Sequence, residues 1–373
     1  MAHAYTPGLK VTNRMSHSIV RMLPIKGDVM VKVGDNVNAD QIVAATYMPG
    51  DVFPLNMANL LAVPPKDVAS LMLRSEGEKI EEGEPLAETA GIFGKFKKKY
   101  NSPYSGTVET ISEVTGQVIL RGPDIPVEVK AYVTGIVTEV KPEIGCTIEA
   151  EVAFIQGIFG IGAETCGEIK FAASDYDHSL QASDITADMK GCVIVGGGRL
   201  THAAIEAARK NGVAALIGGG MDDQDLKDFL GYDLGVAITG SEKKGITVIV
   251  TEGFGDIAMA KRSFDLLKRF EGREASVNGA TQIRAGVMRP EIIIPLGTGD
   301  CEEEVDQVGG YLEIGLPLRI IRDPYFGMIG TVKALPPNPQ VLGSGSKARV
   351  LEVELSGGES VIVPRANVEL IEA

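Results

Sequence analysis

The fold is decided by the stretch Gly191-Cys-Val-Ile-Val-Gly-Gly-Gly-Arg-Leu-Thr-His-Ala-Ala-Ile-Glu-Ala-Ala-Arg-Lys-Asn-Gly-Val-Ala-Ala-Leu-Ile-Gly218. Residues 193–195 and 214–217 are short apolar runs bounded by turn residues, which is typical of strands buried in a parallel sheet. Between them, Thr201 can cap an alanine-rich helix and Gly212 can end it. The stretch therefore predicts a strand, a glycine turn, a helix and a second strand.

The sequence that follows continues the same alternation. Residues 221–231 predict a second helix, and the acidic residues near its start suit the helix dipole. Residues 236–239 and 246–250 predict two more strands, and residues 254–270 predict a third helix that turns apolar residues toward a core. Three strand–helix steps indicate an α/β domain with partly parallel pairing over residues 166–300.

Residues 1–165, ahead of the stretch, are a succession of short β units. Alternating valines at residues 29–33 predict a strand, and Gly34 then supplies a turn. The phrase Gly-x-Val-x-x-Ile/Val occurs twice, beginning at Gly106 and at Gly135, which indicates repeated hairpins. We expect small sheets folded against each other, interrupted by a short helix on either side of the proline pair at positions 64 and 65.

Two phrases in this region resemble a known fold. Val33-Gly-Asp-Asn-Val-Asn-Ala-Asp-Gln-Ile-Val-Ala44 and the later Ser102-Pro-Tyr-Ser-Gly-Thr-Val108 are similar to the barrel-sandwich hybrid of biotinyl and lipoyl carrier domains. The similarity is strongest to the version at the N-terminus of the RnfC family of electron-transport proteins. The carriers hold a modified lysine on the intervening hairpin, so the resemblance implies a partner or anion contact there, or a carrier lysine. The alternative is a solvated loop that limits aggregation. The candidates are Lys95, Lys97, Lys98 and Lys99.

The opening stretch carries a second resemblance. Gly197-Gly-Arg-Leu-Thr-His-Ala-Ala-Ile-Glu-Ala-Ala-Arg209 resembles the mobile, or swivelling, phosphohistidine domain of phosphoenolpyruvate-utilising enzymes. Matched by position, the resemblance implies His202 as phosphocarrier, Thr201 as its hydroxyl neighbour and Arg199 as a phosphate partner, at a helix N-terminus that favours anions. The alternatives are a swivelling-type domain without phosphorylation and an unrelated α/β layer. Glu252 is a further ligand-binding candidate because it ends a predicted strand.

The C-terminal residues 315–373 form a third group of β units. Gly327-Met-Ile-Gly-Thr-Val332 and the closing Val363-Pro-Arg-Ala-Asn-Val-Glu-Leu-Ile371 resemble a KOW module, the small SH3-like barrel of transcription elongation factors and ribosomal proteins. The resemblance implies a surface for a protein partner or for RNA, although interspersed glutamates dilute its positive charge. The expected contact residues are Arg322, Tyr325, Phe326, Lys347, Arg349 and Arg365.

Composition limits the remaining functions. A net charge of −14 argues against nonspecific nucleic-acid binding as the main role. The four cysteines form no CxxC pair and the four histidines are dispersed, so we expect no metal and no cofactor. The N-terminus lacks a signal-peptide pattern, and no apolar run approaches the ~20 residues of a membrane helix, so we expect a cytoplasmic protein without a membrane segment. The apolar, glycine-rich residues 157–162 predict internal packing or self-association as a homo-oligomer.

We therefore expect a mixed β and α/β protein with three parts. These are an N-terminal barrel-sandwich hybrid β domain over residues 1–165, a middle swivelling-like α/β domain, and a C-terminal SH3-like barrel. No nucleophile–base pair is evident, so we expect a non-catalytic, multi-module binding or scaffold protein with a protein partner. One alternative is a phosphotransfer or carrier component that uses His202 or a modified lysine at residues 95–99. Another is an RNA-binding or transcription-linked factor that acts through the KOW module.

Overall fold

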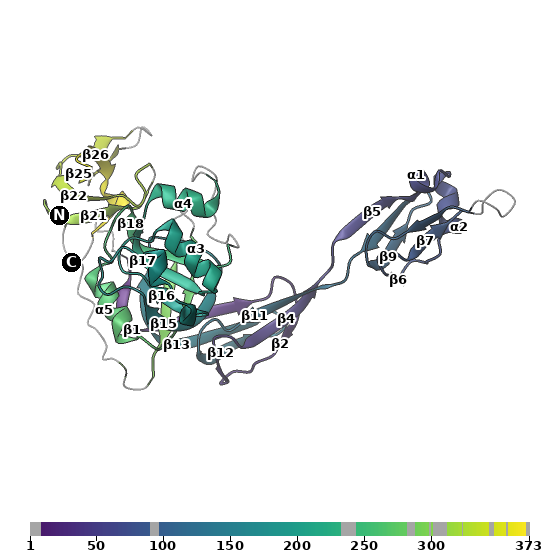
Figure 1. The fold of residues 1–373 in the computed structure, drawn as a ribbon, viewed down its shortest axis with the longest axis horizontal. Coiled ribbons are helices and arrows are strands. Elements are labelled where there is room, and N and C mark those ends of the chain that lie inside the picture. Colours follow the sequence, from purple (N-terminus) through teal and green to yellow (C-terminus); the bar gives the residue numbers. More distant parts are fainter. Residues whose placement is uncertain are drawn as a thin grey trace.

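The computed structural model describes residues 9–89, 97–232, 244–281, 288–297, 300, 312–322, 324–342, 347–355 and 357–370. These residues are mostly strands, arranged in several sheets, with a few short helices. The molecule is elongated, with a small β module at one end of its long axis (Figure 1). Within the described ranges, no helix is long and apolar enough to cross a membrane.

One mixed sheet of eleven strands forms the centre of the molecule. Its strands, in order, are β14 (Phe159–Ile161), β18 (Thr247–Phe254), β17 (Ala215–Met221), β16 (Val193–Val195), β15 (Thr165–Phe171), β19 (Glu274–Asn278), β20 (Glu291–Pro295), β13 (Gly145–Gln156), β12 (Gly135–Lys141) and β3 (Asn36–Val37), and β1 (Val11–Met22) pairs with β13. The four strands β15 to β18 are parallel to one another, and the other pairings are antiparallel. The sheet continues across residue 165, the predicted boundary between the N-terminal β domain and the α/β domain.

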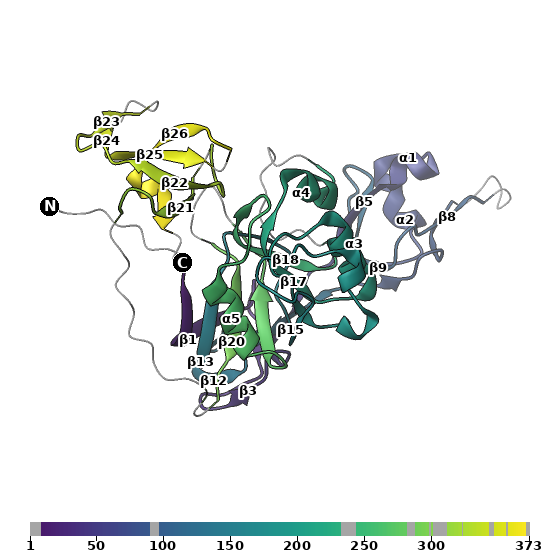
Figure 2. The same cartoon turned by 60° about the vertical axis from the view of Figure 1, so that its left-hand side comes forward.

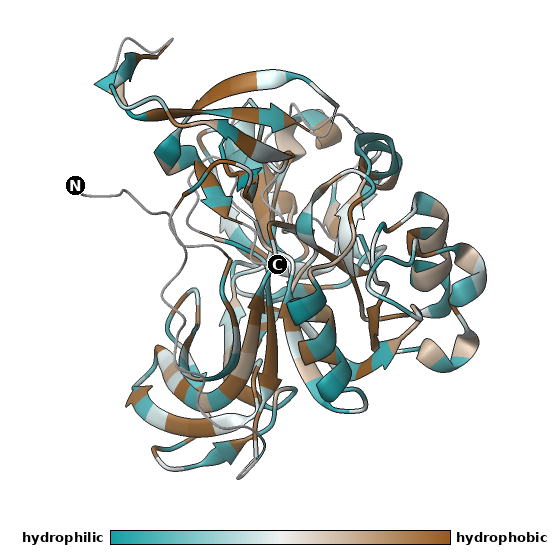
Figure 3. Ribbon diagram, turned by 90° about the vertical axis from the view of Figure 1, so that its left-hand side faces the viewer, coloured by the Kyte–Doolittle hydropathy of each residue, from teal (hydrophilic) through white to brown (hydrophobic). Residues whose placement is uncertain are grey.

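The parallel strands are buried on both faces. This confirms that residues 193–195 and 214–217 contribute buried strands to a parallel part of the sheet. Ile194 and Leu216 face one core and Val193 and Ile217 face the other, because successive side chains of a strand alternate. Residues of α3 (His202–Asn211) and α4 (Asp223–Leu230) belong to the first core, and residues of α5 (Lys261–Arg269) belong to the second. Figure 3 shows hydrophobic residues following the central strands while the helices turn hydrophilic residues outward.

The predicted helix over residues 254–270 is wrong in its first half, because α5 begins only at Lys261. Phe254 still belongs to β18, where it pairs with Met221 of β17. Gly255 then has a φ of +119°, outside the helical region. The strand predicted at residues 236–239 lies outside the described residues.

The run at residues 157–162 lies inside the protein, so it offers no surface for the predicted self-association. Ile158, Phe159 and Ile161 are buried, and β14 pairs with β18. A Cβ on Gly160 would lie 2.7 Å from the carbonyl oxygen of Gly279, so glycine is needed here for close packing.

The N-terminal β units form two groups beside the central sheet. The first is the three-stranded sheet of β11 (Ile125–Lys130), β4 (Ile42–Met48) and β2 (Asp28–Val29). The second, the outlying module, contains the sheet of β5 (Val52–Asn56), β10 (Gln117–Arg121), β9 (Gly106–Ile111) and β6 (Lys79–Ile80), the hairpin of β7 (Pro85–Glu88) and β8 (Lys99–Asn101), and the helices α1 (Met57–Leu61), η1 (Pro65–Asp67) and α2 (Val68–Leu71). It encloses its own apolar core and lies at the end of the β4–β11 ribbon (Figure 1).

Two local predictions in this region need correction. The strand predicted over residues 29–33 ends at Val29; Val31 is buried whereas Val33 is largely exposed, and the main chain forms only isolated bonds there. The helix predicted after the proline pair, over residues 66–74, is shorter in the structure. It ends with α2 at Leu71, and Met72 is extended.

The C-terminal residues form a five-stranded antiparallel sheet around one apolar core. Its order is β26 (Ser360–Pro364), β25 (Val350–Leu355), β22 (Ile329–Ala334), β21 (Pro317–Ile320) and β27 (Val368–Leu370). The remaining short elements of the chain are the hairpin of β23 (Gln340–Val341) and β24 (Lys347–Ala348) and the 3₁₀ turns η2 (Ala182–Asp184), η3 (Ala187–Met189) and η4 (Arg365–Asn367). Figure 2 shows this sheet in yellow, set apart from β13 and β20.

Candidate functional site

Two glycine runs lie at the carboxyl ends of β16 and β17, where open α/β sheets bind their ligands. Residues 196–198 follow β16, and residues 218–220 belong to the C-terminal half of β17. The amide of Gly219 donates to the carbonyls of Gly197 and Gly198 at 2.8 and 2.7 Å. A Cβ on Gly219 would lie 2.4 Å from the amide nitrogen of Met259. The two runs therefore contact other backbone, and their glycines serve close packing.

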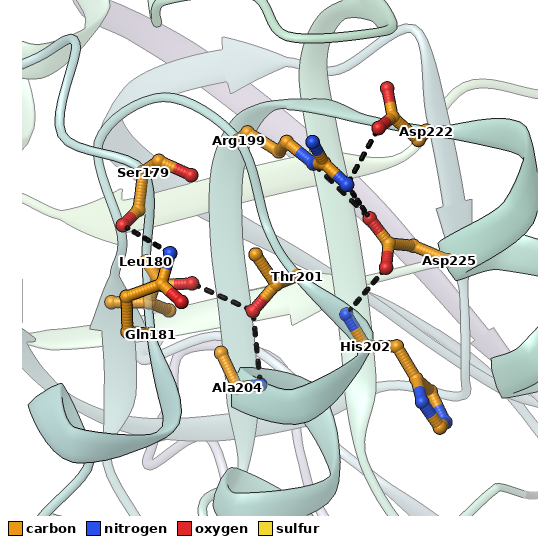
Figure 4. Close-up of polar contacts among 9 residues, drawn as sticks. All are labelled: Ser179, Leu180, Gln181, Arg199, Thr201, His202, Ala204, Asp222 and Asp225. Atoms are coloured by element: carbon orange, nitrogen blue, oxygen red, sulfur yellow. Dashed lines mark hydrogen bonds and ion pairs between the residues drawn. The ribbon is translucent and has the colours of Figure 1, made fainter.

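Arg199, the predicted phosphate partner, lies between two aspartates that follow β17 (Figure 4). One terminal nitrogen, Nη2, lies 2.6 Å from Asp222 Oδ2 and 2.7 Å from Asp225 Oδ2, and Nε donates to Asp225 at 3.2 Å. The hydrogen bond with Asp225 and the nearby carboxylates raise the pKa of Arg199. The guanidinium thus already has two carboxylate partners, and a phosphate would have to compete with both.

Thr201 and His202 begin α3, as predicted, with Thr201 as the N-cap. The Thr201 hydroxyl accepts from the amide of Ala204 at 3.2 Å and donates to the carbonyl of Leu180 at 2.8 Å. The backbone amide of His202 donates to Asp225 Oδ1 at 3.0 Å, whereas its ring points away from Arg199 and Thr201 (Figure 4). The arrangement fixes the helix start and places the carboxylate of Asp225 at its first backbone amide.

Glu252, the second ligand candidate, is buried against the C-terminal sheet. Its Oε1 accepts from the amide of Ala260 at 3.1 Å, and its Oε2 lies 3.6 Å from Arg319 Nη2. Arg319 also donates to the carbonyl of Thr251 at 2.6 Å, and burial lowers its pKa. The adjoining cavity of about 50 Å³ has room for one or two waters. Glu252 therefore links the central sheet to the C-terminal sheet.

The lysines of the basic loop bind within the outlying module. Lys97 and Lys99 lie 2.6 and 3.4 Å from opposite oxygens of Glu88, and the hydrogen bond from Lys97 lowers the pKa of Glu88. Lys98 donates to the carbonyl of Leu60 at 2.7 Å. Lys95 lies outside the described residues. Lys97 and Lys99 thus pair within the β7–β8 hairpin, and Lys98 connects the hairpin to α1.

The six residues predicted as a C-terminal contact surface divide into two groups. Tyr325 and Phe326 are half-buried and pack against apolar cores. Arg365 is also half-buried, and it donates to the carbonyls of Val350 and Pro336. The exposed group is Arg322, Lys347 and Arg349.

Another space lies elsewhere, in a cavity of about 610 Å³ between β1, β11 and the segment that joins β14 to β15. None of the predicted site residues lies in its lining. Local sequence patterns could not have found it, because its residues come from separate parts of the first 166 positions. The lining residues are Arg21, Ala39, Glu128, Lys130, Tyr132, Ala163, Glu164, Thr165 and Cys166.

The part of the chain that the structure describes contains no group of three or more histidines, cysteines, aspartates or glutamates arranged to hold a metal. Comparison of the sequence with protein-family models and with curated proteins finds no match to either.

Proposed function

We propose that this chain is a non-catalytic, multi-module binding or scaffold protein. In this proposal residues 1–165, which include the outlying module, form a barrel-sandwich hybrid region, the α/β part is a swivelling-type domain without phosphorylation, and the C-terminal sheet is a KOW-type barrel. The protein contacts its partners, which are proteins, through the β4–β11 ribbon of the N-terminal region and through the C-terminal sheet. The separate apolar cores of the outlying module and the C-terminal sheet support the modular assignment.

The observation that carries the proposal is the exposed apolar ribbon between the centre and the outlying module. Met48 pairs with Ile125 and Tyr47 pairs with Pro126 across β4 and β11. Tyr47 is 68% exposed, and Met48, Ile125 and the nearby Val52 are also exposed. Because neighbouring side chains of a strand point to opposite faces, both faces of the ribbon present apolar surface to solvent. Exposed apolar surface of this kind is typical of protein–protein contacts.

Charge supports a protein partner over RNA at the C-terminal sheet. Lys333 of β22 lies 3.0 Å from Glu352 of β25. Glu354, also on β25, and Glu359, in the turn between β25 and β26, are exposed. These carboxylates oppose binding of the phosphate backbone, which depends on net neutralisation by lysine and arginine.

Site-specific photo-crosslinking in the organism of origin tests the proposal. A photoreactive residue at position 48 should capture a defined set of proteins, and Tyr47→Ser with Ile125→Thr should reduce the yield about tenfold, as expected when binding anchors are removed. Val114→Ser is the matched control, because Val114 is 88% exposed on the turn between β9 and β10. Equal crosslinking by the wild-type protein and the ribbon variant, or no crosslinks above background, would contradict the proposal.

A further inference from the structure

The 610 Å³ cavity beside β1 has the size of a small-molecule site. An arginine, a lysine and a tyrosine line it, together with acidic residues and Cys166. Its walls come from four segments, so the cavity is a product of how β1, the β3–β4 connection, β11 and the β14–β15 connection pack. Polar groups that converge on such a space are the usual basis of ligand orientation.

Arg21 is fixed at this cavity by contacts of three kinds. Its Nε donates to the carbonyl of Lys130 at 2.7 Å, and its guanidinium carbon lies 5.5 Å from the centre of the Tyr132 ring. Its two terminal nitrogens donate to the two oxygens of Glu164 at 2.9 and 2.7 Å. The Arg21 side chain is 13% exposed and that of Glu164 is 38% exposed. The backbone and the ring therefore hold the arginine, whereas its carboxylate partner lies nearer to solvent.

Tyr132 has a backbone conformation that bulky residues rarely adopt. Its φ is +70°, although it is buried and lies between β11 and β12. Among the described residues, the other two non-glycine residues with positive φ have local explanations, since Ala62 is the C-cap of α1 and Glu143 lies in the turn between β12 and β13. Such conformations cost about 1–3 kcal/mol and cluster at ligand sites. The Tyr132 hydroxyl donates to Glu291 at 3.3 Å, which fixes the ring beside Arg21.

We propose that this cavity binds a small carboxylate, whose two oxygens replace those of Glu164 on the guanidinium of Arg21. The planar fork of an arginine matches a carboxylate through two parallel hydrogen bonds, which the Arg21–Glu164 pair already displays. The exchange of one carboxylate for another leaves the charge of Arg21 compensated at each stage. Lys130 adds a second positive charge at the cavity, and Tyr132 offers an aromatic surface.

The negative groups around the cavity limit what it can bind. Glu128 and Glu164 line it, and Glu291 lies behind Tyr132. Burial raises the pKa of Glu291. A ligand with a single carboxylate fits this balance better than one with several negative charges.

The test uses benzoate as the probe, with benzamide as a neutral control of the same shape. Ligand-detected NMR titrations compare the full-length wild-type chain with Glu164→Gln, which deprives Arg21 of its charged partner. We expect benzoate to bind the variant about tenfold more tightly than the wild type, because the internal competitor is weakened. Arg21→Met introduced into Glu164→Gln should abolish binding, and benzamide should not bind either protein.

Glu151→Gln is the matched control. Glu151 forms a 3.0 Å ion pair with Arg14, which lies on β1 as Arg21 does, and neither residue of this pair lines the cavity. Glu151→Gln should bind benzoate as the wild type does. The proposal is overturned if Glu164→Gln shows no saturable binding of benzoate up to about 10 mM, beyond the millimolar range of weak ligands. It is also overturned if binding survives Arg21→Met or if Glu151→Gln gains equally. Should Arg21→Met fail to fold, Arg21→Lys, which keeps the charge but loses the fork, is judged by the same criterion.

Discussion

Two arginine–carboxylate groups in this protein have similar chemistry and different surroundings. Arg199 lies at the end of the parallel strands, between Asp222 and Asp225, beside turns that contact other backbone. Arg21 has one carboxylate partner, Glu164, and lies at a cavity of about 610 Å³. The first group closes a turn and the second borders open space.

The comparison of Arg199 with Arg21 shows that residue types alone do not distinguish a ligand site from a structural junction. Glycines, an arginine, a threonine and a histidine stand together at residues 196–202, yet the glycines there are needed for close packing. Space for a ligand arises where segments distant in sequence meet, as at Tyr132.

Gly219→Ala should cause the largest loss of stability. The new Cβ would lie 2.4–2.6 Å from backbone atoms of residues 257–259, which cannot move aside as a flexible side chain could. We expect a loss of about 3 kcal/mol in the free energy of unfolding, at the upper end for overpacking. Urea denaturation followed by circular dichroism measures it. Gly357→Ala should change stability little, because nothing lies within 4 Å of the added Cβ. A Gly219→Ala variant as stable as the wild type would show that β17 can accept a Cβ at this position.

Thr201→Ala should have an intermediate effect. The hydroxyl caps α3 through the amide of Ala204 and also donates to the carbonyl of Leu180. Loss of such a cap costs about 1 kcal/mol, and the second bond adds to this, so the same denaturation should show a loss of about 1–2 kcal/mol. Thr201→Ser keeps the hydroxyl and should retain most of the stability. Equal losses in both variants would mean that the methyl group, and not the cap, matters.

Local features of the fold were predictable from the sequence because their causes are local. The N-cap at Thr201, the end of α3 at Gly212 and the parallel pairing of residues 193–195 with 215–217 follow from side-chain chemistry and periodicity within a few residues. The predicted helix over residues 254–270 began too early, because the pairing of Phe254 with Met221 extends β18 beyond what apolar periodicity indicates.

The candidate site was less predictable, because its contacts join distant positions. Glu252 suggested a ligand-binding carboxylate, but its partner is Arg319, which belongs to the C-terminal sheet. The three contacts that fix Arg21 involve residues at least 109 positions away. No pattern within a single segment brings such groups together, so only the packing of β1 against β11 reveals the cavity.

His202→Ala should have the smallest effect and tests the contrast most directly. The His202 side chain is 35% exposed, and its Nε2 lies 3.9 Å from the Glu206 carboxylate. The hydrogen bond that ties this turn to α4 is donated by the backbone amide of His202 to Asp225. Alanine keeps that amide, so we expect a change below about 0.5 kcal/mol, as for surface substitutions away from special features. Asp225→Ala is the informative comparison, because it removes a partner of Arg199 and leaves the His202 amide without this acceptor. It should therefore be clearly less stable in the same urea denaturation. A His202→Ala loss as large as that of Asp225→Ala would show that the imidazole itself organises this turn.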